Sequence, residues 1–231
     1  MKHTEKELQL LKNEINQMWQ IVLSQLEKSK YALFNRDVET ARIVISREKR
    51  VDAYELKIDS DCENYIALYS PVAIDLRLVL SLIKISITLE RIGDFAEGIA
   101  RFVIDDDFEK IDAQLLEELQ LEKMFDLLLT MLYDCFVALE SENTKLSGKI
   151  MSKDDEIDTL YSLSLDILTD YMRKNPDFIR CGMKTYLLIR KLERIGDHCN
   201  NIVEEIVFFV DAKVLKHGGK KQSEHGLSKN T

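Results

Sequence analysis

The chain contains little proline and little glycine. Only two prolines and eight glycines occur in 231 residues, and three of those glycines (Gly218, Gly219 and Gly226) lie close to the C-terminal end. These two residue types most often interrupt helices, so their scarcity predicts long, uninterrupted helices. With 45% hydrophobic and 32% charged residues, the composition is that of a soluble helical bundle.

The chain also lacks paired cysteines. Four cysteines occur without any Cys-x-x-Cys spacing: Cys62, Cys135, Cys181 and Cys199. This pattern indicates free thiols packed as small apolar side chains. We expect neither a signal peptide, because apolar residues alternate with charged ones from the N-terminus onward, nor a membrane span, because no run of about 18 apolar residues occurs. Together these features predict a cytoplasmic protein.

An excess of basic residues is missing as well. The net charge is −9, so we do not expect nonspecific nucleic-acid binding, which requires clustered positive charge. The one basic cluster, close to the C-terminus, consists of Lys213, Lys216, Lys220 and Lys221. The Gly, Ser and Lys content there predicts a disordered tail, which we place at residues 215–231.

Apolar residues recur at three- and four-residue steps, which is the pattern of amphipathic helices. In the first segment the stripe consists of Leu8, Leu11, Ile15, Met18, Trp19, Val22 and Leu26. Pro71 and Pro176 each separate two such segments, and the acidic stretch 105–107 separates the two halves of the chain. We expect six helices, over about 4–35, 37–69, 72–104, 108–142, 144–175 and 177–214.

The second half of the chain repeats the first. The pentapeptide Glu-Arg-Ile-Gly-Asp occurs at 90–94 and again at 193–197, and the two prolines and the pairs Val51-Asp52 and Ile157-Asp158 are separated by nearly the same interval. A duplication with ordered landmarks predicts an all-α fold of two tandem, pseudo-symmetric three-helix bundles. We place the bundles at residues 4–106 and 107–214.

Pairs of acidic residues recur at a spacing of four. Such residues project from the same helix face, one turn apart. Each half has one pair in its second helix and one in its third, and in an antiparallel bundle the two pairs could lie side by side. The eight carboxylates are Glu48, Asp52, Glu90, Asp94, Asp154, Asp158, Glu193 and Asp197.

Two interpretations of these carboxylates remain open. Converging oxygen ligands suit hard cations such as Mg²⁺, Mn²⁺, Ca²⁺ or ferric iron, with zinc less favoured. His198 points away from this face and is not expected to be a ligand. The alternative is a solvated acidic face paired with Arg91, Arg194 or Lys84.

A glycine occupies the same position in both pentapeptides. Glycine within a helix costs about 1 kcal/mol relative to alanine, so Gly93 and Gly196 predict a close approach by a neighbouring helix or by a bound ion cluster. Helix packing is the simpler explanation. Motifs of catalysis, such as a Gly-rich phosphate loop or Gly-x-Ser-x-Gly, do not occur, and we do not expect an enzyme.

These motifs together resemble the PhoU family of phosphate-uptake regulators. The resemblance rests on the doubled pentapeptide with its upstream acidic helix and proline turn, on Pro71-x-x-x-Asp75-Leu76-Arg77, and on Gly196-Asp197-His198-x-x-Asn201-Ile202. It covers residues 4–212. The halves differ in two places: Gly98 stands where the second half has Asn201, and the segment 176–181 lacks the Asp-Leu-Arg sequence.

The resemblance implies a function and a set of partners. Some family members bind multinuclear metal clusters through Glu/Asp-x-x-x-Asp motifs, which carries over to the same eight carboxylates, with iron, manganese, magnesium or zinc as candidate metals. The family also implies a cytoplasmic negative regulator of phosphate uptake and phosphate-starvation signalling. Such a protein would contact the ATPase subunit of a phosphate ABC transporter and a sensor histidine kinase, and would reach the membrane only through these partners. No motif sets the oligomeric state, although the acidic faces and long helices allow a homodimer.

Two other functions remain open. One is an accessory regulator of a sodium–phosphate cotransporter or of a low-affinity phosphate permease. The other is a metal-storage protein or a metal-dependent enzyme built on a helical bundle, which the eight carboxylates would support.

Overall fold

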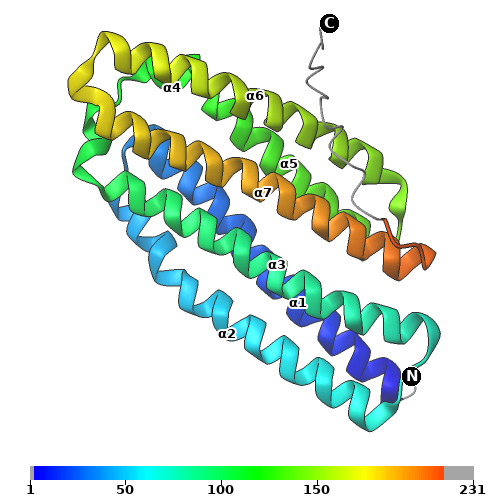
Figure 1. Cartoon of the computed structure of the whole chain (residues 1–231). Coiled ribbons are helices and arrows are strands. Elements are labelled where there is room, and N and C mark those ends of the chain that lie inside the picture. The colour runs from blue at the N-terminus through cyan, green and yellow to red at the C-terminus, as the bar shows by residue number, and fades with distance from the viewer. Residues whose placement is uncertain (1–2, 216–231) are drawn as a thin grey trace, which may run out of the picture.

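The computed structural model describes residues 3–215, which are helical almost throughout. The first half consists of three long antiparallel helices, α1 (His3–Asn35), α2 (Val38–Tyr69) and α3 (Ala73–Ile104). Figure 1 shows them side by side, as the sequence predicts. The predicted tail begins at residue 215, and residues 216–231 lie outside the described part of the chain.

The second half contains shorter elements before its last two long helices. They are η1 (Asp106–Lys110), α4 (Ala113–Glu118), α5 (Leu121–Glu140), η2 (Thr144–Leu146), α6 (Ser147–Lys174), η3 (Pro176–Phe178) and α7 (Ile179–Asp211). No strand occurs within residues 3–215. The all-α fold with an internal repeat is therefore confirmed. None of these helices is long and apolar enough to cross a lipid bilayer.

The single helix expected over 108–142 is wrong, because the chain breaks there twice. Asp112 begins α4 by accepting a hydrogen bond from the backbone N–H of Leu115 at 2.7 Å. Gln120 then takes a left-handed conformation, with φ of 51°, which ends α4 before α5 begins. The last helix is also shorter than expected, since left-handed Ala212 ends α7 at Asp211.

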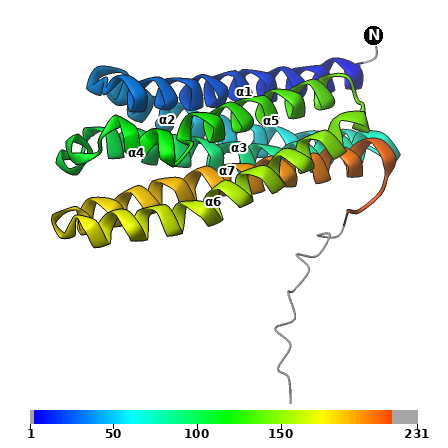
Figure 2. The ribbon, with the colours of Figure 1, turned by 90° about the horizontal axis from the view of Figure 1, so that it is seen from above.

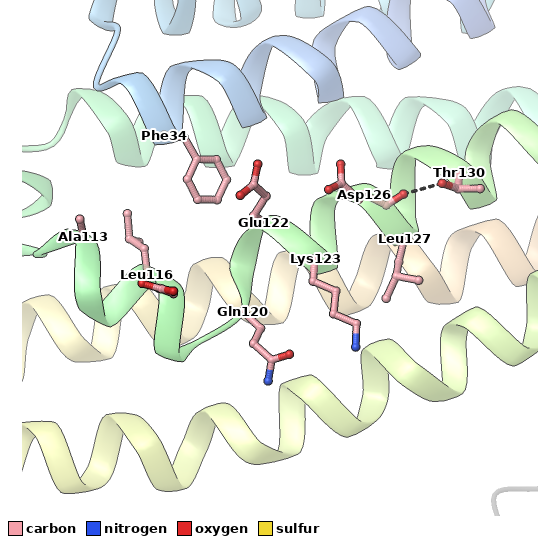
Figure 3. A pocket seen from close by; sticks show the side chains of 10 residues that line it. Phe34, Ala113, Leu116, Gln120, Glu122, Lys123, Asp126, Leu127 and Thr130 are labelled. Carbon is pink, nitrogen blue, oxygen red and sulfur yellow. Dashed lines mark hydrogen bonds between the residues drawn. The ribbon is translucent and has the colours of Figure 1, made fainter.

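The break between α4 and α5 opens a groove of about 730 Å³ on the surface. Figure 3 shows its lining, which comes from α4, α5 and the end of α1 and includes Phe34, Leu116 and Leu127. Asp126 of the lining pairs with Lys30 of α1 at 2.5 Å. The second half therefore has a broken helix, α4 and α5, where the first half has the continuous helix α1.

The two halves share one hydrophobic core. Buried apolar residues of α1, α2 and α3 form a continuous cluster with those of α4 to α7. The helices run along one common direction, with α1 at one side and α6 at the other (Figure 2). Trp19 of α1 is fully buried and donates its indole N–H to the carbonyl oxygen of Leu132 in α5 at 3.2 Å. The repeats are therefore packed against each other as one body.

Antiparallel packing of α3 against α7 joins the repeats along their length. The apolar stripe on α3 that includes Leu89, Ile92 and Ile99 is completely buried. At the start of α3, Arg77 donates its Nε–H to the carbonyl oxygen of Phe209 near the end of α7, at 3.2 Å. At the other end, Lys184 near the start of α7 pairs with Asp105, just beyond α3, at 2.7 Å.

We predict that Trp19→Phe lowers the free energy of unfolding by about 1–3 kcal/mol, because it removes a buried hydrogen bond and leaves a cavity between the repeats. Urea denaturation followed by circular dichroism measures the change. Tyr133→Phe, at a position 56% exposed on α5, is the control and should change the free energy by less than about 0.5 kcal/mol. Equal effects of the two substitutions would contradict a shared core.

Candidate functional site: two acidic clusters

The structure brings the acidic pairs of each half together. The pair on α2 lies beside the pair on α3, so that the charges of Asp94 and Asp52 both act on Glu48. On α6 and α7, the charges of Asp158, Asp197 and Glu193 act on Asp154 in the same way. We call Glu48, Asp52, Glu55, Glu90, Asp94 and Glu97 the first acidic cluster, and Asp154, Asp158, Glu193 and Asp197 the second acidic cluster.

In the first acidic cluster, the carboxylate of Glu48 lies against the backbone of α3 at Gly93. A Cβ atom at Gly93 would stand 3.3 Å from Glu48 Oε1 and 3.4 Å from Gln25 Oε1. Gln25 donates to Glu48 Oε2 at 2.8 Å, and Glu48 is only 8% exposed. Glu48 Oε1 and Gln25 Oε1 are buried and have no hydrogen-bond partner within the described residues.

The second acidic cluster repeats this arrangement at Gly196. A Cβ atom there would lie closer than 3.0 Å to Asp154 Oδ1. Asn200 of α7 donates to Asp154 Oδ2 at 2.6 Å, and Asp154 is also 8% exposed. Asp154 Oδ1 and Asn200 Oδ1 are again buried without a partner in the part of the chain that the structure describes. In both halves the glycine makes room for a buried carboxylate from the neighbouring helix.

Burial changes the acidity of these carboxyls. It raises the pKa of Glu48 to about 7, against the effect of the Gln25 hydrogen bond and with the help of the Asp94 charge. Burial, followed by the Asp158 and Asp197 charges, raises the pKa of Asp154 to about 7. Burial and the Asp94 charge do the same for Glu90. The ionised form of each carboxyl group is therefore poorly compensated by nearby positive charge. A bound cation would supply that charge.

Arginines offset part of the negative charge, as the alternative interpretation predicts. Arg91 lies 3.6 Å from Glu90 and 3.7 Å from Asp94, and Arg194 lies 3.2 Å from Asp197. Lys84 pairs with Glu205 and not with either cluster. Across residues 3–215, the side chains as placed form no group of three or more His, Cys, Asp or Glu residues arranged to hold a metal ion.

His198 faces α3, away from the carboxylates. Its ring stacks on Phe95 with the centroids 5.6 Å apart, and burial lowers its pKa. Phe95 and His198 each follow directly after a pentapeptide. Their contact places the two pentapeptides next to each other across the α3–α7 interface, with the acidic clusters on either side.

The two clusters are not identical. The first contains Glu55, at the position that Tyr161 occupies in the second half. Tyr161 stacks on Tyr186 and shares a hydrogen bond with it at 2.7 Å, which together with burial raises the pKa of Tyr161 to about 12. Asn200 likewise replaces Glu97. The first cluster therefore carries more negative charge than the second.

Sequence reasoning missed Gln25, Glu55 and Asn200. Glu55 extends the acidic face of α2 by one turn beyond Asp52, a signal that the spacing contains. Gln25 is a polar residue within the apolar stripe of α1, between Val22 and Ser29, both fully buried. A buried amide of this kind needs a polar partner, but the sequence does not say which one.

We predict that Gly196→Ala lowers the free energy of unfolding by about 1–3 kcal/mol, because the added methyl group displaces the Asp154 carboxylate from its place against α7. Chemical denaturation of the metal-chelated protein measures this. Gly148→Ala is the matched control, since a Cβ atom there meets nothing within 4 Å, and it should leave the stability unchanged or slightly higher. If Gly196→Ala left the stability unchanged, the close approach of the Asp154 carboxylate to Gly196 would not be required.

Comparison with known proteins agrees with the repeat and the fold. The family model described as "PhoU domain" matches residues 15–103 and again residues 121–206. Over 214 residues the chain is 31% identical to the phosphate-specific transport system accessory protein PhoU homolog 1 of Thermotoga maritima, covering 93% of this chain and 91% of that protein. It is 32% identical over 213 residues to the phosphate-specific transport system accessory protein PhoU of Escherichia coli, covering 92% and 87%.

Two crystal structures have the same fold. PhoU from Pseudomonas aeruginosa superposes with a TM-score of 0.82 at 29% identity, over 90% of this chain and 99% of that one. The phosphate transport system regulatory protein PhoU from Streptococcus pneumoniae gives a TM-score of 0.81 at 28% identity, over 93% and 100%. The resemblance drawn from the pentapeptides is confirmed, and the chain belongs to the PhoU family.

Proposed function

We propose that this protein is a cytoplasmic accessory regulator of a phosphate transport system, which restrains phosphate uptake and phosphate-starvation signalling. One observation carries the proposal: the likeness to proteins named as accessory proteins of phosphate-specific transport extends over more than nine-tenths of the chain. It includes both repeats. The function therefore rests on the whole architecture and not on one short motif.

The protein would act as an adaptor and not as an enzyme. Its partners would be the ATPase subunit of a phosphate ABC transporter and a sensor histidine kinase. A net charge of −9 and the two acidic clusters would favour basic surfaces on these partners, because complementary charge steers association and selects among partners. The alternative, an accessory role with a sodium–phosphate cotransporter or a low-affinity permease, uses the same surface, and the neighbouring genes would distinguish the two.

We further propose that the acidic clusters bind hard cations. Glu48 and Asp154 support this, because each has a buried carboxylate oxygen without a partner in the described residues, at a place where a glycine of the neighbouring helix lets the carboxylate approach the backbone. With Asp52, Glu90 and Asp94 in the first cluster, and Asp158, Glu193 and Asp197 in the second, the donors are all oxygens. Such donors suit iron, manganese or magnesium better than zinc. A bound cation would neutralise the clusters and tie α2 to α3 and α6 to α7.

Deleting the gene should raise alkaline phosphatase activity and transporter expression in cells grown with ample phosphate, because the restraint on starvation signalling is lost. Reporter assays and transcript levels, with and without a plasmid copy of the gene, measure the effect. Unchanged expression in the deletion strain, together with no binding between the purified protein and the transporter ATPase or kinase, would contradict the regulatory role.

The gently purified protein should contain iron, manganese, magnesium or zinc by elemental analysis, and replacing Asp52 and Asp94 together by asparagine should reduce the content. Asp155→Asn is the control, because Asp155 is an exposed residue next to buried Asp154 on α6. Metal-free protein whose melting temperature does not change when these ions are added would rule out the cation sites and leave the regulatory role untouched. Phosphate release or oxidase activity in metal-loaded protein would instead favour a metal-dependent enzyme.

A further inference from the structure

A groove on the side of α2 that faces away from the first acidic cluster is lined by arginines and not by carboxylates. It has a volume of about 570 Å³ and lies between α1 and α2, with one side chain from α5. Figure 1 shows α1 and α2 lying side by side along this region. No carboxylate lines the groove, although the chain has 41 acidic and 32 basic residues. The side chains used below are Arg47, Arg50, Asn16, Gln17, Gln20 and Phe136.

Both arginines have donors to spare. Arg47 donates one hydrogen bond, to the hydroxyl of Ser24 at 3.1 Å. Arg50 lies over the ring of Tyr54, with 5.8 Å between its guanidinium carbon and the ring centroid. Neither forms an ion pair with a carboxylate of residues 3–215. Each guanidinium has five N–H donors in a fixed fork, so most of the donors in this groove are unused.

The two arginines are placed to act together. They are three residues apart on α2, so they are neighbours on one helix face. That face is turned away from Glu48, which packs on α3 at Gly93. An anion held between the arginines would therefore be separated by the body of α2 from the carboxylates of the first acidic cluster.

The rest of the lining offers amides and an aromatic ring. Gln17 accepts a hydrogen bond from the Tyr54 hydroxyl at 2.7 Å, which leaves its NH₂ group to donate. Gln20 is exposed on the next turn of α1. Phe136 packs on Trp19, with 5.7 Å between centroids, and presents a partly exposed ring. Asn16 donates to the carboxylate of Glu140 at 2.9 Å, which places a negative charge near that end of the groove. The positive end is therefore the one with the arginines.

We infer that this groove binds a small phosphate-bearing anion, with its phosphate group on Arg47 and Arg50. Guanidinium forks match phosphate oxygens in geometry and charge. Inorganic phosphate and the phosphate group of a nucleotide share this chemistry. The volume falls in the range of ordinary small-molecule sites, so a nucleotide also fits, with its base near Phe136 and the glutamine amides. The site is independent of the cation sites proposed above.

Isothermal titration of the full-length, chelator-treated protein with inorganic phosphate, AMP and adenosine tests the inference. Chelation removes any cation that could bind phosphate at the acidic clusters. We expect heat from phosphate or AMP and none from adenosine. Tighter binding of AMP than of phosphate identifies a nucleotide site, and comparable binding identifies a phosphate site. Binding of neither at millimolar concentration overturns the inference.

Three variants locate the binding. Replacing Arg47 and Arg50 together by glutamine should weaken it at least 10-fold. Arg42→Gln is the control, since it removes one arginine charge from an α2 residue that is paired with Glu39 outside the groove, and it should have little effect. Gln20→Glu keeps both arginines and should weaken binding by repulsion, which guards against misfolding of the double variant. Wild-type affinity in the double variant or in Gln20→Glu overturns the assignment.

Discussion

The packing of α3 against α7 determines where everything else in this protein lies. These two helices carry the pentapeptides, and their antiparallel contact brings Phe95 onto His198. Each helix buries its apolar stripe in the shared core and turns its carboxylates towards α2 or α6. Because the two helices are equivalent, one packing arrangement produces both acidic clusters. A three-helix bundle of this size alone would bury less of its apolar surface, so the duplication also contributes to stability.

Much of this arrangement could be predicted from the sequence. The stripe through Leu11, Ile15 and Trp19 predicted the buried face of α1 correctly, since all three are buried, and the proline positions predicted the turns. The break at Gln120 could not be predicted, because glutamine has no particular tendency to take a left-handed conformation, and tertiary packing decides it. The place of Gln25 beside Glu48 also depends on how α1 packs across α2 and α3, which helix periodicity does not contain.

The arginines stabilise only the more exposed carboxylates of the acidic clusters. Arg91 and Arg194 lie by the more exposed carboxylates, Asp94 and Asp197, on the solvent side. Neither forms an ion pair with the buried carboxylates, whose inner oxygens remain without donors. Burying a charged group without compensation is costly, so ion pairing at the surface does not account for Glu48 and Asp154. Because burial raises the pKa of both groups to about 7, protonation removes the charge as the pH falls through neutrality, and a cation would instead stabilise the ionised forms.

Helix α2 separates charges of opposite sign by geometry alone. With 3.6 residues per turn, Glu48 and Asp52 share one face, while Arg47 and Arg50 share a face turned towards α1. The same helix therefore presents carboxylates to α3 and guanidinium groups to α1, with the fully buried side chain of Val44 on its inner side. A cation on one side would fix α2 to α3, and an anion on the other would fix it to α1. Because the groove lining includes Phe136 of the second half, a nucleotide with its base near that ring would contact both repeats, whereas inorganic phosphate on the two arginines would contact only the first.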